Sequence, residues 1–377
     1  MKKILIFSGD YPTPDNPAYA FIKPVACEMA DLGLECTVVC PQSLTNSLIR
    51  HKKRRPEQWF DETENHNRVC ILQPWTISFS DRGKTLNNFF SKAAIRRARK
   101  KYRLEPDVVY GHFWDNAVLA HETFGDKPLI AVSGESTIRV RNNWDEASIS
   151  AMKENLTGLI AVSTKNLNES EQCGLWDPNV AHIVLPNAVN PQEFYQMSTA
   201  DARKKLGLSQ EQTIACFVGA FSDGKGVHRV IEAAKGIDGL KLILIGSGDQ
   251  SIKPDEQILF AGRLPHEQIV TYLNAADFFV LPTKAEGCCN AIVEALACGL
   301  PVVSSDCPFN DDILNENNSI RIAPTDVPAL HEAMQKLTDD LSLRQKLARG
   351  AEQSGAELKI TTRVKKIVEF IQQVVLK

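Results

Sequence analysis

Two glutamates in the second half of the chain have a spacing that suits ligand binding. Glu286 and Glu294 are separated by seven residues, after an apolar run at 278–281 that predicts a strand. Between them lies a loop that opens a predicted helix: Gly287, Cys288, Cys289 and Asn290. Backbone N–H groups at a helix start favour phosphate, and carboxylates accept hydrogen bonds from sugar hydroxyls. Taken alone, Glu286 also fits a helix cap and Glu294 an exposed helical side chain.

Three residues in the first half also follow predicted strands. Gly9 and Asp10 follow Ser8 at the end of the apolar run 4–7, and His112 follows the run 107–110. Open α/β sheets bind ligands at the carboxyl ends of their strands, so these positions are candidates for ligand contact. A Gly-Asp turn also forms without any function, and His112 fits a structural place equally well. The first loop lacks the Gly-x-Gly-x-x-Gly spacing of a dinucleotide site.

Short apolar runs alternate with helical patterns along nearly the whole chain. The first half predicts a helix at 20–32 and strands at 4–7, 37–40, 107–110 and 129–132. The second half predicts strands at 214–218, 241–245, 258–260, 278–281 and 301–304, with helices at 227–235, 265–274 and from about 290. Parallel sheets covered by helices have this pattern. A chain that begins such a sheet twice is expected to contain two Rossmann-like α/β domains.

The expected domain boundary lies near 185–194, where Pro186 and Pro191 interrupt the pattern. The N-terminal domain is expected to cover residues 1–190 and the C-terminal domain 191–361. The tail at 362–377 is predicted to be an amphipathic helix. Its apolar residues recur with helical spacing: Val364, Ile367, Phe370, Ile371 and Val374.

Length, charge and composition exclude several classes of protein. The chain has 377 residues, a net charge of −3 and a pI near 6.3, so its overall charge gives no attraction to nucleic acid. No run approaches the roughly 18 apolar residues of a membrane-spanning helix, and the first residues predict a buried strand instead of a secretory signal. A cytoplasmic location is therefore expected. The cysteines lack zinc-ligand spacing, and reduced buried thiols are favoured over disulfides.

Basic residues cluster in two stretches of the first half, at 51–55 and from Lys84 to Arg103. The second stretch carries Lys84, Lys92, Arg96, Arg97, Arg99, Lys100, Lys101 and Arg103. Apolar residues lie beside these charges: Phe89, Phe90, Ala93 and Ile95. The segment predicts either an amphipathic helix on anionic lipid at the inner face of the membrane or a solvated helix face.

Taken together, the motifs resemble the retaining GT-B glycosyltransferases of family four. From Glu286 to Val303 the chain has the pattern Glu-x7-Glu followed by Ala-x-Ala-x-Gly-x-Pro-Val-Val. Further segments are similar to the family in the same order: 186–190 (Pro-Asn-Ala-Val-Asn), 219–226 (Gly-Ala-Phe-Ser-Asp-Gly-Lys-Gly), 244–248, 260–264 and 276–282. The resemblance covers essentially the whole chain and is denser in the C-terminal half.

This resemblance implies a GT-B architecture, in which two facing Rossmann-like domains enclose an interdomain cleft. It implies transfer of a sugar with retention of the anomeric configuration. The donor is expected to be a UDP- or GDP-sugar, and the acceptor a glycan or lipid-linked hydroxyl in surface polysaccharide or lipopolysaccharide biosynthesis. No cofactor or metal is expected, and the sequence has no Asp-x-Asp motif.

The resemblance also implies roles for individual residues. Lys225 would act in catalysis by neutralising the leaving diphosphate, where bond cleavage concentrates negative charge. Glu286 would hold hydroxyls of the transferred sugar, and Glu294 would hold the ribose. The remaining donor-binding residues are Gly219, Gly226, Gly246, Arg263, Gly287, Cys288, Cys289 and Asn290. Acceptor or cleft contacts are expected from Gly9, Asp10, His112, Ser133 and Glu135.

The chain departs from the family pattern at two positions. Ala220 stands where the family usually has an arginine. One diphosphate cation is therefore missing or comes from elsewhere, with Arg229 and Arg263 as candidates. Ser133 or Gly134 stands where many relatives have a histidine.

Three other classes of protein stay open at this point. An epimerase would use the same donor site without an acceptor. A non-catalytic nucleotide-sugar-binding protein would fit the two departures from the family pattern. A dinucleotide-dependent oxidoreductase is disfavoured because the glycine fingerprint is missing.

Overall fold

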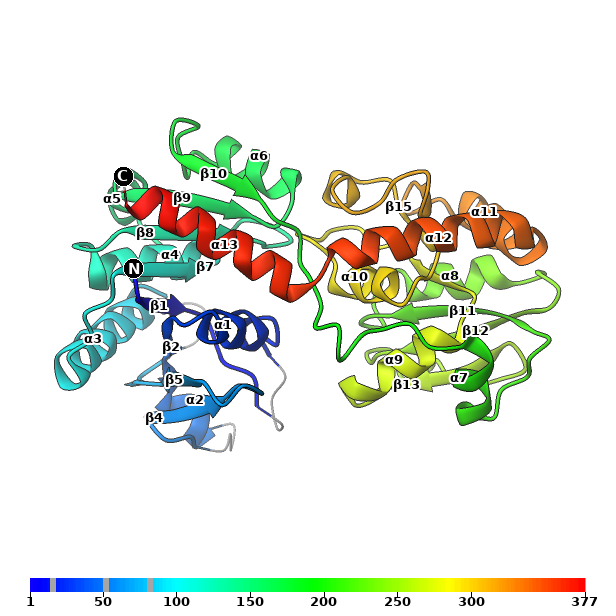
Figure 1. The fold of residues 1–377 in the computed structure, drawn as a ribbon, viewed down its shortest axis with the longest axis horizontal. Helices are drawn as coiled ribbons and strands as arrows, with labels where there is room; N and C mark the ends of the chain where they lie inside the picture. The colour runs from blue at the N-terminus through cyan, green and yellow to red at the C-terminus, as the bar shows by residue number, and fades with distance from the viewer. Residues whose placement is uncertain (14–17, 50–53, 80–83, 377) are drawn as a thin grey trace. The chain divides into compact units, whose positions relative to one another are not determined.

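The computed structural model describes residues 1–13, 18–49, 54–79 and 84–376 (Figure 1). They form two compact units, Met1–Leu185 with Arg363–Lys377, and Pro186–Thr362. Each unit is built around its own parallel sheet with helices, which confirms the predicted α/β fold class. Residues 51–53 of the first basic stretch lie outside the described residues.

In its described residues, the first unit has an eight-stranded sheet in the order β10-β9-β8-β7-β1-β2-β5-β4. The strands are β1 (Lys3–Phe7), β2 (Glu35–Val39), β4 (Gln58–Glu62), β5 (Arg68–Leu72), β7 (Val108–His112), β8 (Leu129–Ser133), β9 (Leu156–Ala161) and β10 (Ala181–Val184). Neighbouring strands are parallel except for β4, which is antiparallel to β5. Strands β7 and β8 are buried along their whole length, as expected for apolar runs covered on both faces. Separately, β3 (Gln42–Ser43) pairs with β6 (Trp75–Thr76).

The described helices before residue 185 differ in how their N-termini are capped. They are α1 (Ile22–Asp31), α2 (Leu44–Ile49), α3 (Lys84–Tyr102), α4 (Trp114–Phe124), α5 (Glu146–Glu154) and α6 (Thr164–Gln172). Helices α5 and α6 have ordinary N-caps, because the side chains of Asp145 and Ser163 accept backbone hydrogen bonds. Helix α4 starts after Phe113, which has a φ of 73° and provides no side-chain cap.

The basic segment that was predicted as a helix forms α3. Its residues Ala94, Ile95 and Ala98 are buried in the first unit. Leu86 and Phe89, nearer its start, are exposed. The apolar side of α3 is therefore divided, and only its first turns leave large apolar side chains uncovered.

In the second unit, all of whose residues are described, six parallel strands follow the order β13-β12-β11-β14-β15-β16. They are β11 (Thr213–Val218), β12 (Leu240–Ile245), β13 (Ile258–Gly262), β14 (Phe278–Leu281), β15 (Val302–Ser305) and β16 (Ser319–Ile322). The helices are α7 (Thr199–Leu206), α8 (Val227–Ala234), α9 (His266–Ala275), α10 (Asn290–Ala297), α11 (Val327–Asp339) and α12 (Leu341–Glu357). The order reverses between β11 and β14, as in a doubly wound nucleotide-binding sheet.

Helix α13 (Ile360–Val375) carries the predicted apolar stripe. Val364, Ile367, Phe370 and Ile371 are buried. A Cβ placed on Gly158 of β9 would lie 3.1 Å from the Phe370 ring, so the helix packs closely on that strand. Packing of this stripe is what joins residues 363–377 to the first unit.

None of the helices in the described residues is long and apolar enough to cross a membrane. All ten cysteines lie among the described residues, and none of them forms a disulfide there.

Replacing Phe370 with alanine should destabilise the protein by about 3–5 kcal/mol, because a buried aromatic ring leaves a cavity against Gly158. Denaturant unfolding would measure the free-energy change. Gln373→Ala, at an exposed position of the same helix, is the control and should change stability by less than about 0.5 kcal/mol. Equal effects of both substitutions would contradict the packing of α13.

Candidate functional site

Two loops at the carboxyl ends of β11 and β14 form the candidate site. The glycine loop (219–226) joins β11 to α8, and the glutamate loop (282–289) joins β14 to α10. Because β11 and β14 are neighbours where the strand order reverses, both loops lie at the position where open α/β sheets bind ligands. Parallel strands therefore bring together two segments that lie far apart in the sequence.

Hydrogen bonds and ion pairs hold the two loops to each other. The backbone N–H of Lys284 donates to Gly224 O at 2.9 Å, and Lys284 Nζ lies 2.6 Å from Asp223 Oδ2. Arg229 donates to Pro282 O at 2.9 Å and pairs with Asp223 at 2.8 Å. Asp223 thus contacts two cations, one from each side of the site, while its own side chain is 77% exposed.

Lys225 and Glu286, the two residues predicted to act in catalysis, form an ion pair across the loops. Thr283 Oγ1 also donates to Glu286 Oε1, at 3.0 Å. The side chains of Lys225 and Glu286 are 29% and 13% exposed, so water screens their attraction only in part. Burial alone would lower the pKa of Lys225, but the charge of Glu286 and the hydrogen bond to it raise this pKa overall. Lys225 is therefore a firmly protonated cation.

Helix α10 begins at this pair without a side-chain cap of its own. Gly287, Cys288 and Cys289 are buried at its start, and Asn290 is exposed. Asn187 Nδ2 donates to Cys288 O at 3.0 Å and to Asn290 Oδ1 at 2.8 Å, which anchors the segment. An uncapped helix start beside a lysine presents backbone N–H groups and positive charge to an anion.

Glu294 lies one turn into α10 and meets a residue that the sequence analysis missed. His266 Nε2 is 3.6 Å from Glu294 Oε1, and His266 Nδ1 is 3.7 Å from Glu193 Oε2. The hydrogen bond to Glu294 raises the pKa of His266 above its usual value. The position of His266 in the sequence could have identified it, because His266 is the first residue of the helix that follows β13.

The predicted glycines hold the ends of β11, β12 and β13 side by side. Gly219 N donates to Ile245 O at 2.9 Å, and Gly246 N donates to Gly262 O at 2.8 Å. A Cβ on Gly246 would overlap Gly219 O, so only glycine fits there. Gly226 starts α8 with a φ of 82°, a conformation that other residues rarely adopt.

The two candidates to replace the cation missing at Ala220 lie in different settings. Arg229 is only 12% exposed, and its guanidinium already contacts Asp223 and Pro282. Arg263 is exposed directly after β13. Lys284 lies on the glutamate loop itself and pairs with Asp223.

The loop after β1 is held by an arginine of the first basic stretch. Asp10 Oδ1 accepts from Tyr11 N at 2.8 Å and pairs with Arg55 Nη1 at 3.1 Å. Gly9 is exposed, and a Cβ there would overlap the ring of Tyr19. The carboxylate of Asp10 therefore fixes the shape of its own loop.

His112 is buried at the end of β7. Its ring stacks on Phe21 at 4.6 Å between centroids and contacts Phe113 at the same distance. Burial, reinforced by the charge of Arg363, lowers the pKa of His112 to about 3. This is the environment of a packed, neutral imidazole.

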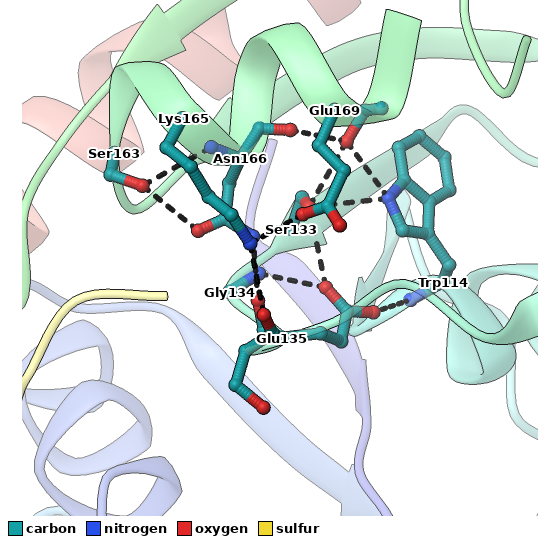
Figure 2. Close-up of polar contacts among 10 residues, drawn as sticks. Trp114, Ser133, Gly134, Glu135, Ser163, Lys165, Asn166 and Glu169 are labelled. Carbon is teal, nitrogen blue, oxygen red and sulfur yellow. Dashed lines mark hydrogen bonds and ion pairs between the residues drawn. The ribbon is translucent and has the colours of Figure 1, made fainter. Parts of the chain in front are cut away.

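Glu135 and Ser133 belong to a buried polar network at the start of α4 (Figure 2). Trp114 N and Gly134 N donate to the Glu135 carboxylate at 2.6 and 2.9 Å, and Trp114 Nε1 donates to Ser133 Oγ at 3.2 Å. Asn166 Nδ2 binds Glu135 O at 2.9 Å. Glu135 thus supplies the cap that Phe113 lacks.

The predicted residues therefore fall into separate groups. The structure brings Lys225, Glu286 and the residues 287–290 together at one helix start. Glu294 lies with His266. In the first unit, Ser133 and Glu135 share one network, while His112 and Asp10 have other partners. Among the described residues, no group of three or more His, Cys, Asp or Glu side chains is arranged to hold a metal ion.

The unit that holds this site matches a known protein family. Residues 198–354 match the family model of glycosyl transferases group 1. TuaC of Bacillus subtilis (strain 168), a glycosyltransferase assigned to teichuronic acid biosynthesis, is 26% identical over 348 residues, which cover 89% of this chain and 88% of that protein. A glycogen synthase of Mycobacterium tuberculosis (strain ATCC 25618 / H37Rv) is 26% identical over 273 residues, covering 66% of this chain and 64% of that protein.

Solved structures share the fold over the full length. Sucrose-phosphate synthase from Thermosynechococcus elongatus matches with a TM-score of 0.79 and 18% identity, covering 100% of both chains. Anabaena HepE, solved in complex with UDP and glucose, matches with a TM-score of 0.72 and 17% identity, covering 99% of this chain and 100% of that one. These likenesses show the GT-B fold.

The cap formed by Glu135 should make stability depend on pH. Burial raises the pKa of Glu135 above its usual value of about 4.3, although hydrogen bonds to the carboxylate oppose this. The folded state therefore binds the proton more tightly than the unfolded state, and this group's contribution to stability falls as pH rises through the raised pKa. Glu135→Gln has no such titration. Its stability relative to wild type should increase between about pH 4 and pH 7, as measured by urea unfolding.

Two further results bear on the same cap. Glu135→Ala, which leaves Trp114 N and Gly134 N without their acceptor, should cost about 1–3 kcal/mol. A pH-independent difference between Glu135→Gln and wild type would contradict a buried, titrating carboxylate.

Proposed function

We propose that this chain, which has the GT-B fold and matches the model of glycosyl transferases group 1 over residues 198–354, transfers a sugar from a UDP- or GDP-sugar to a hydroxyl of a glycan or lipid-linked acceptor. The observation that carries the proposal is the meeting of Lys225 and Glu286 at the uncapped start of α10. A cation, a helix start without a side-chain cap and a carboxylate there suit the phosphate and sugar of one ligand.

Each part of this arrangement has a role in the proposed reaction. Lys225 neutralises the diphosphate as the glycosidic bond breaks, because that step concentrates negative charge on the leaving group. The N–H groups of 287–290 contribute further positive potential. Glu286 orients the transferred sugar through its hydroxyls.

The nucleoside is proposed to bind along the ends of β11 to β13. Glu294 accepts hydrogen bonds from the ribose, and His266 keeps that carboxylate in place. Gly219 and Gly246 let the backbone approach the base, with Arg263 beside it. Because residue 220 is alanine, it adds no positive charge beside Lys225 to bind the diphosphate. Arg229 is already engaged by Asp223 and Pro282.

We further propose that the reaction retains the anomeric configuration and proceeds without a metal. The leaving phosphate then assists in removing the acceptor proton. This fits the first unit, where His112 and Glu135 are both engaged in internal packing or hydrogen bonds. The likeness to TuaC supports a place in surface polysaccharide biosynthesis, and lipopolysaccharide is the related alternative.

Peripheral contact of a cytoplasmic enzyme with the inner face of the membrane is also proposed, through the first turns of α3. Leu86 and Phe89 are 51% and 60% exposed, and Phe79, which contacts Phe90, is 49% exposed. Several α3 cations pair with the chain's own acids, among them Lys92 with Glu122 and Lys101 with Glu57. The apolar side chains are therefore expected to contribute more than the charges.

The donor site is tested by binding of nucleotides to Lys225→Ala. Removing the lysine should reduce the affinity for a nucleoside diphosphate at least about tenfold, because the second phosphate loses a charged partner. The affinity for the matching monophosphate should fall much less. Calorimetry with UDP, UMP, GDP and GMP would measure both. Lys284→Ala, a cation on the neighbouring loop that pairs with Asp223, is the control and should have the smaller effect.

Two outcomes would redirect the proposal. Equal losses for diphosphate and monophosphate would remove Lys225 from the phosphate site. Binding of a nucleotide sugar without release of nucleotide when acceptor glycans are added would favour a non-catalytic binding protein.

Membrane contact is tested by sedimentation with vesicles that contain anionic lipid. The double variant Leu86→Ser, Phe89→Ser should bind at least about tenfold more weakly than wild type, because two exposed apolar anchors are lost. Leu341→Ser removes an apolar residue that is 55% exposed in the second unit and should leave binding unchanged. No sedimentation of the wild type would identify α3 as a solvated face.

A further inference from the structure

The residues proposed to bind opposite ends of the donor contact each other directly. Lys225 pairs with Glu286, and the Glu286 oxygen that binds Lys225 also accepts from Thr283. Both partners are largely buried, so an unpaired charge at either position would be costly. This pairing has a consequence for which ligands bind well.

A bare nucleoside diphosphate must take Lys225 away from Glu286. Of its contacts with the described residues, the carboxylate would then keep the hydrogen bond from Thr283 while new negative charge arrives beside it. A nucleotide that still carries its sugar brings hydroxyl donors, which replace the lost lysine contact. For the intact donor, its sugar hydroxyls therefore offset the cost of separating Lys225 from Glu286. For the nucleoside diphosphate, nothing offsets this cost.

From this arrangement we infer that Glu286 determines specificity for the sugar-linked donor over the nucleoside diphosphate product. The inference rests on the proposed donor site and deepens it. Glu286 attracts the donor's hydroxyls, and through Lys225 it disfavours the product. Release of the product is thereby favoured after transfer.

Neighbouring groups do not share this role. Asp223, the other carboxylate of the two loops, pairs with Arg229 and Lys284. Cys289 lies near Lys225, but burial raises the pKa of its thiol and keeps it neutral. Among the described residues, Glu286 is thus the acid whose charge directly competes with a phosphate for Lys225.

The test compares binding of nucleoside diphosphate and nucleotide sugar to wild type and Glu286→Gln. The amide is nearly isosteric and removes the charge. Glu286→Gln should bind the bare diphosphate about fivefold more tightly, since the ion pair no longer competes, and the sugar conjugate more weakly than wild type. Calorimetry with UDP, GDP and their glucose and mannose conjugates would measure both shifts.

Asp223→Asn makes the same change of charge on the glycine loop and is the matched control. It should alter diphosphate affinity by less than about twofold, because Asp223 has other partners. An unchanged or weaker diphosphate affinity of Glu286→Gln, or an equal gain with Asp223→Asn, would overturn the inference. Wild type that binds neither diphosphate nor conjugate would instead overturn the proposed donor site itself.

Thr283→Val provides an independent variant if Glu286→Gln does not fold. It removes the hydrogen bond that remains on Glu286 after Lys225 leaves. Diphosphate binding should then weaken about twofold or more, opposite in direction to Glu286→Gln. A gain in diphosphate affinity would contradict the competition between Glu286 and phosphate.

Discussion

The parallel pairing of β11 with β14 is the constraint on which the candidate site depends. Parallel strands carry their following loops to the same edge of the sheet, so the glycine loop and the glutamate loop meet although Lys225 and Glu286 are 61 positions apart in the sequence. The reversal of strand order at this pair makes it a ligand position.

Charge balance then shapes the site. Asp223 joins Arg229 and Lys284, while Glu286 takes Lys225. Each of these three cations therefore has a carboxylate partner within the second unit, and a phosphate proposed to bind Lys225 must compete with Glu286 for it.

The first unit uses its polar residues differently. Glu135 accepts from the start of α4, and Asp10 from its own loop and Arg55. A carboxylate at a helix N-terminus is stabilised by the same N–H groups that would bind an external anion. In α4 the chain's own side chain occupies that position, whereas α10 begins without one. This contrast favours the second unit as the place where phosphate binds.

Local pattern in the sequence was enough to predict the parallel α/β class and most strands of the second sheet, because burial on both faces requires continuous apolar runs. It was also enough to predict the loop that opens α10, because helix starts have their own composition. The pairing of Lys225 with Glu286, the meeting of His266 with Glu294, and the turning of Glu135 toward α4 were decided by tertiary structure. These contacts depend on which strands become neighbours and on side-chain direction, and neither is encoded in the spacing of residues along one segment.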